Sequence, residues 1–175
     1  MELRDRVAIV TGAGGGLGKA HAELLASLGA KVLVNDMNEE AAEMVAAALR
    51  STGAEALAFA ASVTDEKRIE EMVAHVLAAW GRVDILVNNA GILRDRTFAK
   101  MSLAEFREVL DVHLMGSVVC TKAVWEIMRE QRYGRVVMTT SSSGLFGNFG
   151  QSNYGAAKMA LVGLMQTLAL EGEKY

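Results

Sequence analysis

The sequence predicts a protein of the α/β class, with a doubly wound parallel sheet that helices cover on both faces. Two observations predict this class. Short apolar runs alternate along the 175 residues with longer stretches of helical apolar spacing, and a glycine-rich turn joins the first run to the first helical stretch. Strands buried on both faces read as unbroken apolar runs, and consecutive parallel strands need a crossover helix between them. No repeat or low-complexity tract interrupts the series, so we expect one domain over residues 1–175.

The expected elements alternate from one end of the chain to the other. We expect strands near residues 6–11, 31–36, 55–60, 83–88 and 134–141. We expect helices near residues 17–29, 39–52, 66–80, 103–130 and 152–172. The helix over residues 103–130 is either continuous or broken near residue 111. Gly53, Gly81 and Gly134 stand where helices are expected to stop, and each crossover should be right-handed.

The turn between the first strand and the first helix is suited to binding a dinucleotide. Residues 6–18 read RVAIVTGAGGGLG, and a flexible linker would not be flanked by an apolar strand and an amphipathic helix at once. Gly12 would allow the sharp turn, Gly16 would leave room for a pyrophosphate, and Gly18 would let the helix pack closely on the sheet. Free N–H groups at the helix start would face the phosphates. The predicted fold is therefore a Rossmann fold, with phosphate contacts from Gly12, Gly14, Gly15, Gly16, Leu17 and Gly18.

An acidic residue follows the second predicted strand. Asp36 is the last residue of this strand, which begins at Lys31. A carboxylate at this place can accept hydrogen bonds from the adenosine ribose and would repel the additional phosphate of NADP. No Lys or Arg lies between Asp36 and Glu43, which also favours NAD over NADP. The alternative role for Asp36 is to cap the helix expected to begin near Glu39.

Tyr154 and Lys158 lie four residues apart in a predicted helix, so their Cβ atoms should be about 5–6 Å apart on one face. An ammonium at that distance favours the phenolate by about 3–4 kcal/mol at an effective dielectric constant of about 20. This lowers the expected pKa of the phenol toward neutral pH, where it can act as a general acid or base. The alternative is an ordinary surface pair on a helix.

In combination, these motifs resemble the classical short-chain dehydrogenase/reductases over essentially the whole chain. The matching motifs are Thr11-Gly-x-x-x-Gly-x-Gly18, Asn88-Asn-Ala-Gly91, Ser141 and Tyr154-x-x-x-Lys158. The segments NNAGILRDRTFAKMS, DVHLMGS, YGRVVMTTSSSGLFGNFGQSNY and LALEG are most similar to one branch. That branch is the (3R)-hydroxyacyl-CoA dehydrogenase unit of the peroxisomal multifunctional β-oxidation enzyme and its bacterial relatives.

The resemblance implies a role for each matching residue. Tyr154 would be the catalytic acid or base, Lys158 would lower its pKa and hold the nicotinamide ribose, and Ser141 would hydrogen-bond the substrate oxygen. The segment that begins at Asn88 would line the cofactor and support the sheet. The cofactor contacts implied outside the glycine-rich turn are Asp36, Ser62, Val63, Asn89, Ala90, Gly91, Tyr154 and Lys158.

Two positions depart from the family pattern. His113 stands where the family commonly has an Asn that helps to organise a proton-relay water. A neutral imidazole both donates and accepts a hydrogen bond, so His113 is a catalytic candidate, and a structural helix histidine is the alternative. Ser62, in the run Ser62-Val63-Thr64, stands where the family often has an Asp near the adenine. We therefore expect the adenine contact there to be weaker or to be made by the backbone.

The expected activity is an NAD-dependent interconversion of a secondary alcohol and a ketone, most simply a 3-hydroxyacyl or 3-oxoacyl thioester of fatty-acid metabolism. A 3-oxoacyl carrier-protein reductase or another secondary-alcohol dehydrogenase is the alternative within enzymes. A non-catalytic dinucleotide-binding fragment is the alternative from another class.

Composition narrows the other classes of partner. The formal net charge is −3, which does not favour a nucleic-acid partner. The single cysteine, Cys120, cannot form a disulfide within the chain and favours a reducing compartment, so we expect a cytoplasmic protein. The three histidines are scattered without metal-ligand spacing, no run of about 18 uncharged apolar residues suggests a membrane span, and the charged start does not resemble a secretory signal.

Two further expectations concern the second half of the chain. The last two long helices carry wide apolar faces, which include Val118, Val119, Ala123, Ile127, Leu161, Leu164 and Leu168. The resemblance implies a homodimer or homotetramer, because the matching helices of the family pair across a twofold axis. The alternative is that these faces only cover the chain's own sheet. The family's final strands and substrate-covering segment have no counterpart after Tyr175. We therefore expect a fragment whose last strand, near residues 135–140, is an exposed apolar edge.

Overall fold

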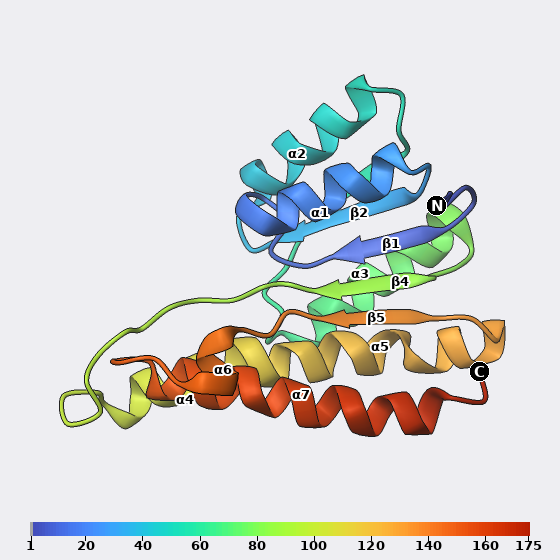
Figure 1. The fold of residues 1–175 in the computed structure, drawn as a ribbon. Helices are drawn as coiled ribbons and strands as arrows, with labels where there is room; N and C mark the ends of the chain where they lie inside the picture. Colours follow the sequence, from blue (N-terminus) through green and yellow to red (C-terminus); the bar gives the residue numbers. More distant parts are fainter. Residues whose placement is uncertain (1) are drawn as a thin grey trace.

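The computed structural model describes residues 2–175, which form a five-stranded parallel sheet in the order β3-β2-β1-β4-β5 (Figure 1). The strands are β1 (Val7–Val10), β2 (Lys31–Asp36), β3 (Ala56–Ala60), β4 (Ile85–Asn88) and β5 (Arg135–Met138). The chain moves outward from β1 to β3 and then returns to the other side of β1 for β4 and β5. This reversal opens a crevice at the carboxyl ends of β1 and β4. The predicted doubly wound parallel sheet is confirmed.

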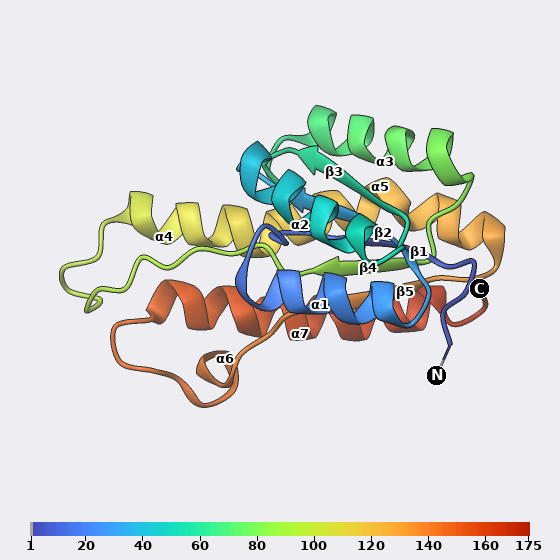
Figure 2. The ribbon, with the colours of Figure 1, turned by 90° about the horizontal axis from the view of Figure 1, so that it is seen from above.

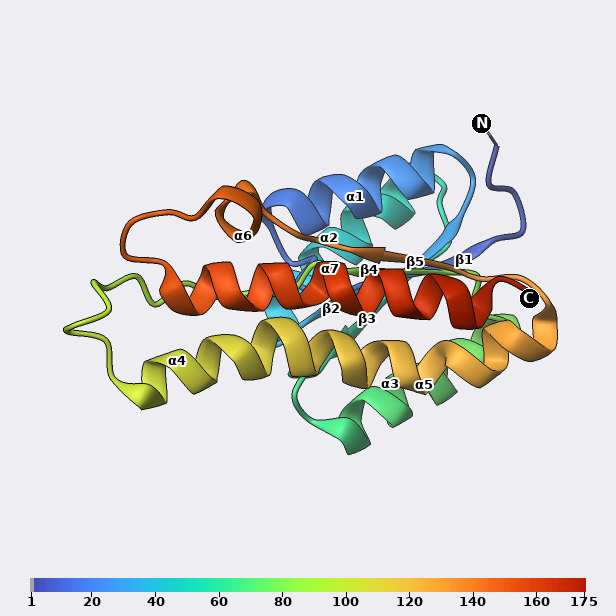
Figure 3. The same cartoon turned by 60° about the horizontal axis from the view of Figure 1, so that its bottom comes forward.

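Helices connect the strands and cover both faces of the sheet. They are α1 (Gly16–Ser27), α2 (Glu39–Ser51), α3 (Glu66–Trp80), α4 (Leu103–Leu110), the π-helix η1 (Asp111–Met115), α5 (Gly116–Gln131), α6 (Ser142–Phe146) and α7 (Ser152–Gly172). α1 and α2 pack on one face, and α3 and α5 on the other (Figures 1 and 2). α4, η1 and α5 form one rod, and α7 runs beside it (Figure 3). Among residues 2–175, none of the helices combines the length and apolar character that crossing a membrane needs.

The strand β1 shows why its sequence is apolar without alternation. Ala8 and Val10 lie in the apolar cluster that includes α1 and α2, whereas Val7 and Ile9 lie in the cluster that includes α3 and α5. All four side chains are at most 1% exposed. Both faces of the strand are therefore buried, as expected for a parallel sheet covered on both sides.

The structure differs from the predicted elements in three places. The helix expected over residues 103–130 is not broken near residue 111, because the π-helix η1 continues it there. The short helix α6 was not predicted. Gly53 (φ +88°) and Gly81 (φ +71°) end helices as expected. The prediction for Gly134 is wrong, because α5 ends at Gln131 and its C-cap residue, Arg132, already adopts φ +54°.

Gly134 is instead required by packing. A Cβ atom there would lie 2.6 Å from Sδ of Met128, a buried residue of α5. Its small size lets the start of β5 approach the helix that precedes it.

β5 forms one edge of the sheet, and in residues 2–175 it pairs only with β4. Its residues alternate between exposed and half-buried, and Val137 is 48% exposed. A groove of about 560 Å³ runs beside it, lined by residues that include Trp125, Val136 and Met165. The predicted exposed edge is confirmed for the part of the chain that the structure describes.

Candidate active site

The predicted site residues lie in the segments that follow the five strands, in η1 and in the first turns of α7. Because parallel strands point the same way, these segments meet at one end of the sheet (Figure 2). The groove beside β5 is not this site, because it reaches Gly134 and Tyr175 rather than Tyr154 and Lys158.

Thr11 joins the turn after β1 to the segment after β4. Its Oγ1 donates to Val87 O (3.3 Å) and accepts from the N–H groups of Asn89 (3.0 Å) and Ala90 (3.1 Å). The Asn89 side chain in turn donates hydrogen bonds to the carbonyl oxygens of Thr11 and Gly12, both at 3.0 Å. These bonds fix the two walls of the crevice relative to each other. Sequence reasoning included Thr11 in a motif but assigned it no role.

The start of α1 leaves room for an anion. Gly16 adopts φ +53°, and a Cβ atom on Gly15 or Gly16 would meet no atom within 4 Å. Gly15 is the N-cap but supplies no side-chain cap, and the first turn contains no acidic residue. The N–H groups of that turn are therefore free of side-chain acceptors, which suits a phosphate. A Cβ on Gly18 would lie 2.2 Å from Gly12 O, so this glycine does pack closely on the strand end; Leu17 is exposed.

Asp36 lies at the end of β2 with its carboxylate oriented by two backbone groups. Oδ2 accepts from Gly14 N–H and Oδ1 from Asn38 N–H, both at 3.0 Å. The alternative that Asp36 caps the next helix is wrong, because Asn38 is the N-cap of α2 and accepts from Ala41 N–H. Asp36 instead holds the glycine-rich turn against β2. Each oxygen keeps a further lone pair for a ligand.

Lys158 is buried beside Tyr154. Its side chain is 3% exposed, its Nζ lies 5.5 Å from the centroid of the Tyr154 ring, and Nζ donates to Thr139 O at 2.5 Å. The Lys158 carbonyl accepts from Thr140 Oγ1 (2.8 Å). Burial lowers the pKa of Lys158 from 10.5 to about 8. The amine is therefore still mainly protonated at neutral pH and supplies a positive charge next to the phenol.

His113 contacts both Tyr154 and the segment after β4. Its ring meets the Tyr154 ring edge to face, with centroids 5.2 Å apart. Its Nε2 lies 3.0 Å from Ile92 N and 2.8 Å from Ile92 O, so one tautomer accepts from the amide and the other donates to the carbonyl. Nδ1 is buried and has no partner among the described residues. Burial, followed by the charge of Lys158, lowers the pKa of His113 against the opposing effect of the Ile92 hydrogen bond.

A buried polar atom without a partner is costly. Nδ1 of His113 therefore provides a place for a water molecule or another polar group.

Gly91 is fixed by the same histidine. A Cβ atom at Gly91 would lie 2.3 Å from Cε1 of His113. The ring thus occupies the space of the missing side chain, and the two predicted site residues are in direct contact.

Ser141 lies just before α6, and Asn153 lies in the first turn of α7. Ser141 is the N-cap of α6, and its Oγ accepts from Ser143 N–H (3.2 Å). Ser141 Oγ acts only as an acceptor in this cap, so its hydroxyl hydrogen can be donated to a ligand. Asn153 is fully buried, accepts from Tyr154 N–H (2.7 Å) and donates to Arg94 O (3.1 Å). Sequence reasoning missed Asn153, although its position next to Tyr154 was a signal.

Ser62 and Val63 lie at the edge of this arrangement. Ser62 Oγ is hydrogen-bonded to Thr64 Oγ1 (2.8 Å) and accepts from Thr64 N–H. Val63 is buried, and a Cβ atom at Gly116 would lie 2.5 Å from its Cγ2. Val63 therefore supports the junction of η1 and α5 by packing. In residues 2–175 no three His, Cys, Asp or Glu side chains gather so as to hold a metal ion.

Comparisons with known proteins identify the family of this chain. A family profile described as short chain dehydrogenase matches residues 6–175. The chain is 50% identical over 184 residues to the peroxisomal hydratase-dehydrogenase-epimerase of Saccharomyces cerevisiae, covering 100% of this chain and 20% of that protein. It is 42% identical over 170 residues to the 3-oxoacyl-(acyl-carrier-protein) reductase of Synechocystis, covering 97% of this chain and 69% of that protein.

Among solved structures, NAD⁺-bound xylitol dehydrogenase matches with a TM-score of 0.96 at 35% identity, over 99% of this chain and 67% of that chain. The chain thus spans about a fifth of the yeast relative and two thirds of the solved structure.

Proposed function

The chain belongs to the short-chain dehydrogenase family, and from this premise we propose that it is an NAD-dependent oxidoreductase of secondary alcohols. The proposed substrate is a 3-hydroxyacyl or 3-oxoacyl thioester of fatty-acid metabolism. The observation that carries the proposal is the buried Lys158 amine 5.5 Å from the Tyr154 ring. A lysine amine is rarely buried without a function, and this one lies beside the ring of Tyr154.

The residues at the carboxyl end of the sheet fit a dinucleotide. The uncapped start of α1 would take the phosphates, and the two oriented oxygens of Asp36 would take the adenosine ribose hydroxyls. Asn89, Ala90 and Gly91 would line the cofactor from the opposite wall. When bound, the nicotinamide supplies the hydride chemistry. The carboxylate of Asp36 supports the preference for NAD, because it would repel the additional phosphate of NADP.

The side chains divide the remaining chemistry. In alcohol oxidation, Tyr154 Oη would take the proton of the substrate hydroxyl, and in ketone reduction it would return that proton. The Lys158 cation would stabilise the negative charge that develops on Tyr154 Oη as the proton moves. Ser141 Oγ–H would donate to the substrate oxygen and stabilise its developing charge. His113 would position the Tyr154 ring and bind a relay water at Nδ1.

A direct assay tests the proposal. The protein is incubated with NAD and 3-hydroxybutyryl-CoA, and NADH absorbance is followed, with Tyr154→Phe as the matched control. Formation of NADH by the parent and not by the variant supports the proposal. Binding of NAD without turnover would instead support a non-catalytic dinucleotide-binding module.

A carrier-protein reductase is the second candidate, because of the 42% identity to the Synechocystis protein of that name. In that case this protein would reduce 3-oxoacyl groups attached to acyl carrier protein faster than the same groups attached to CoA. Comparison of the two carriers with the same acyl group, using NADH and NADPH in turn, separates the candidates.

We further propose one dinucleotide-binding domain that assembles as a homodimer or homotetramer in the cytoplasm. Leu161 is buried within the chain, but Leu164 and Leu168 on α7 are only half-buried and Met165 is 42% exposed, which supports an interface there. Light scattering measures the assembly, and cell fractionation tests the location, since the yeast relative is named peroxisomal.

A further inference from the structure

β3 forms the edge of the sheet on the side opposite β5, and in residues 2–175 it pairs only with β2. α2 packs on one face of this strand and α3 on the other (Figure 2). Residues 56–64 contain no charged residue, no proline and no glycine. The free N–H and C=O groups of such an edge are a template for a strand of another chain. A protein with this edge needs a feature that prevents the pairing.

The register of the two strands shows which backbone groups of β3 face outward. Val32 N–H in β2 donates to Glu55 O (3.0 Å). Ala61 N–H donates to the carbonyl oxygen of Asp36 at the other end of β2 (3.1 Å). The odd-numbered residues of this segment therefore bond to β2, and the even-numbered residues direct their N–H and C=O groups to the open side. These outward residues are Ala56, Ala58 and Ala60.

Two arginine side chains occupy outward carbonyl groups at the two ends of β3. Arg50, in the last turn of α2, donates from Nη1 to Ala56 O (3.1 Å). Arg68, in the first turn of α3, donates from Nη2 to Ala60 O (2.9 Å). The Ala58 carbonyl lies between them. A second strand could bond along this edge only after it displaced both guanidinium groups.

Each arginine is held in this position by a carboxylate of its own helix. Arg50 forms an ion pair with Glu43 on α2, and Arg68 forms one with Glu71 on α3 (2.6 Å). The Arg68 guanidinium also lies over the ring of Phe59, 4.6 Å from its centroid. Ion pairs as exposed as these contribute little to stability. Protection of the edge explains better why one stands at each end of the same strand.

We propose that Arg50 and Arg68 close the β3 edge against pairing with β3 of a second copy of this chain. The second copy is the partner because the uncharged segment is identical in both copies and can pair with itself about a twofold axis. This contact is separate from the apolar faces of α5 and α7, since β3 lies at the opposite edge of the sheet from β5. The two arginines thus limit which surfaces of the protein can assemble.

Light scattering of the double variant Arg50→Met/Arg68→Met tests the proposal. Methionine removes both donors but keeps an apolar stem over the strand. As the concentration rises, the mean mass of this variant should exceed that of the parent by about twofold, because each opened edge pairs with one other.

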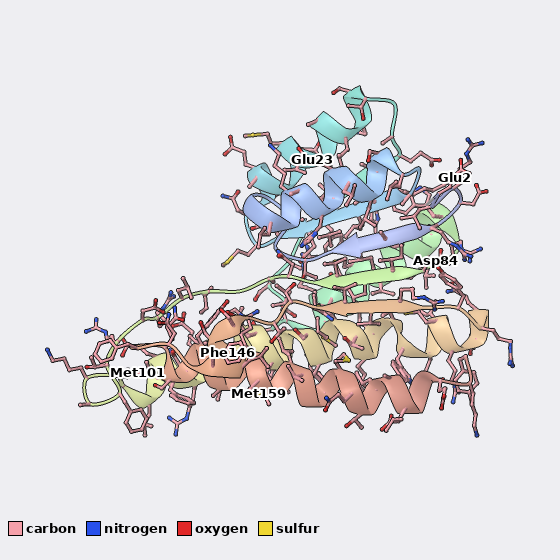
Figure 4. The ribbon with its side chains drawn as sticks, viewed as in Figure 1. Glu2, Glu23, Asp84, Met101, Phe146 and Met159 are labelled. Carbon is pink, nitrogen blue, oxygen red and sulfur yellow. The ribbon has the colours of Figure 1, made fainter. Side chains whose placement is uncertain are left out.

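Arg4→Met/Arg107→Met is the matched control, because it changes the net charge by the same amount and touches no strand edge. Arg4 forms an ion pair with Glu2 (2.7 Å), which Figure 4 shows near the amino ends of the strands. Arg107 is exposed on α4. The mean mass of this control should equal that of the parent at every concentration.

Amide hydrogen exchange locates the contact. In the double variant, the N–H groups of Ala56, Ala58 and Ala60 should exchange about tenfold more slowly at high than at low concentration, because pairing protects them. A folded double variant with the mass of the parent overturns the proposal. A larger mass without protection of these amides also overturns it, because the copies then meet elsewhere.

The single variants Arg50→Met and Arg68→Met each open one end of the edge. Each should raise the mean mass above that of the control but less than the double variant does. Where only the single variants fold, masses equal to that of the parent overturn the proposal.

Discussion

The ring of His113 fills the space that a side chain on Gly91 would need, since a Cβ atom there would lie 2.3 Å from Cε1. Gly91→Ala should therefore destabilise the protein by about 1–3 kcal/mol, the usual cost of an added methyl group in a tight site. In a His113→Ala background the same change should cost much less. Urea unfolding of the four proteins measures this coupling.

Gly163→Ala is the control for that experiment, because Gly163 lies in α7 and a Cβ atom there would meet nothing within 4 Å. It should stabilise the helix by up to about 1 kcal/mol. An equal cost of Gly91→Ala in both backgrounds would show that His113 is not the cause.

Tyr154→Phe should lower turnover at least about 100-fold, because it removes the hydroxyl that exchanges the proton. The ring and its edge-to-face contact with His113 remain, so NAD affinity and stability should change little. Steady-state kinetics and calorimetry measure the two properties on the same preparation. Turnover close to that of the parent would show that the acid–base assignment is wrong.

Lys158 gives a stability that depends on pH. Its pKa is lowered by burial from 10.5 to about 8 in the folded protein. Between pH 8 and pH 10.5 the unfolded chain holds a proton that the folded chain has released, so this lysine makes the free energy of unfolding rise with pH in that window. Its unfavourable contribution is fully present below pH 8.

The free energy of unfolding of the parent should therefore rise relative to that of Lys158→Met as the pH increases from 7 to 10. Lys122→Met changes an exposed lysine and serves as the control. A difference in free energy of unfolding between the parent and Lys158→Met that does not change with pH would show that burial does not lower the pKa of Lys158.

Asp36→Asn should narrow the preference for NAD over NADP by about tenfold. The amide removes the negative charge, while its oxygen can still accept one of the two backbone hydrogen bonds that orient the side chain. Affinities for both cofactors, determined by calorimetry, measure the effect. Equal affinities of the parent for NAD and NADP would show that the Asp36 carboxylate does not discriminate between the two cofactors.

Local patterns predicted the features that depend on neighbouring residues. The glycine-rich turn and the Tyr154–Lys158 pair follow from spacing along one strand, turn or helix. The apolar run of β1 predicted a strand buried on both faces because every residue in it is apolar. These interpretations needed no knowledge of distant contacts.

The features that sequence reasoning missed are packing contacts, and two of them join segments that are distant in the chain. Gly91 and His113 are 22 residues apart, and Thr139 reaches Lys158 across 19 residues. Gly134 resembles a helix stop, but its position is set by Met128 beneath it. The π-helix η1 likewise has no local signal, since its sequence is compatible with an ordinary helix.

Lys158 is anchored at both ends by consecutive residues that follow β5: Thr139 accepts from its Nζ, and Thr140 donates to its carbonyl. The position of this amine therefore depends on where the last strand of the sheet ends, and not only on the helix that carries it.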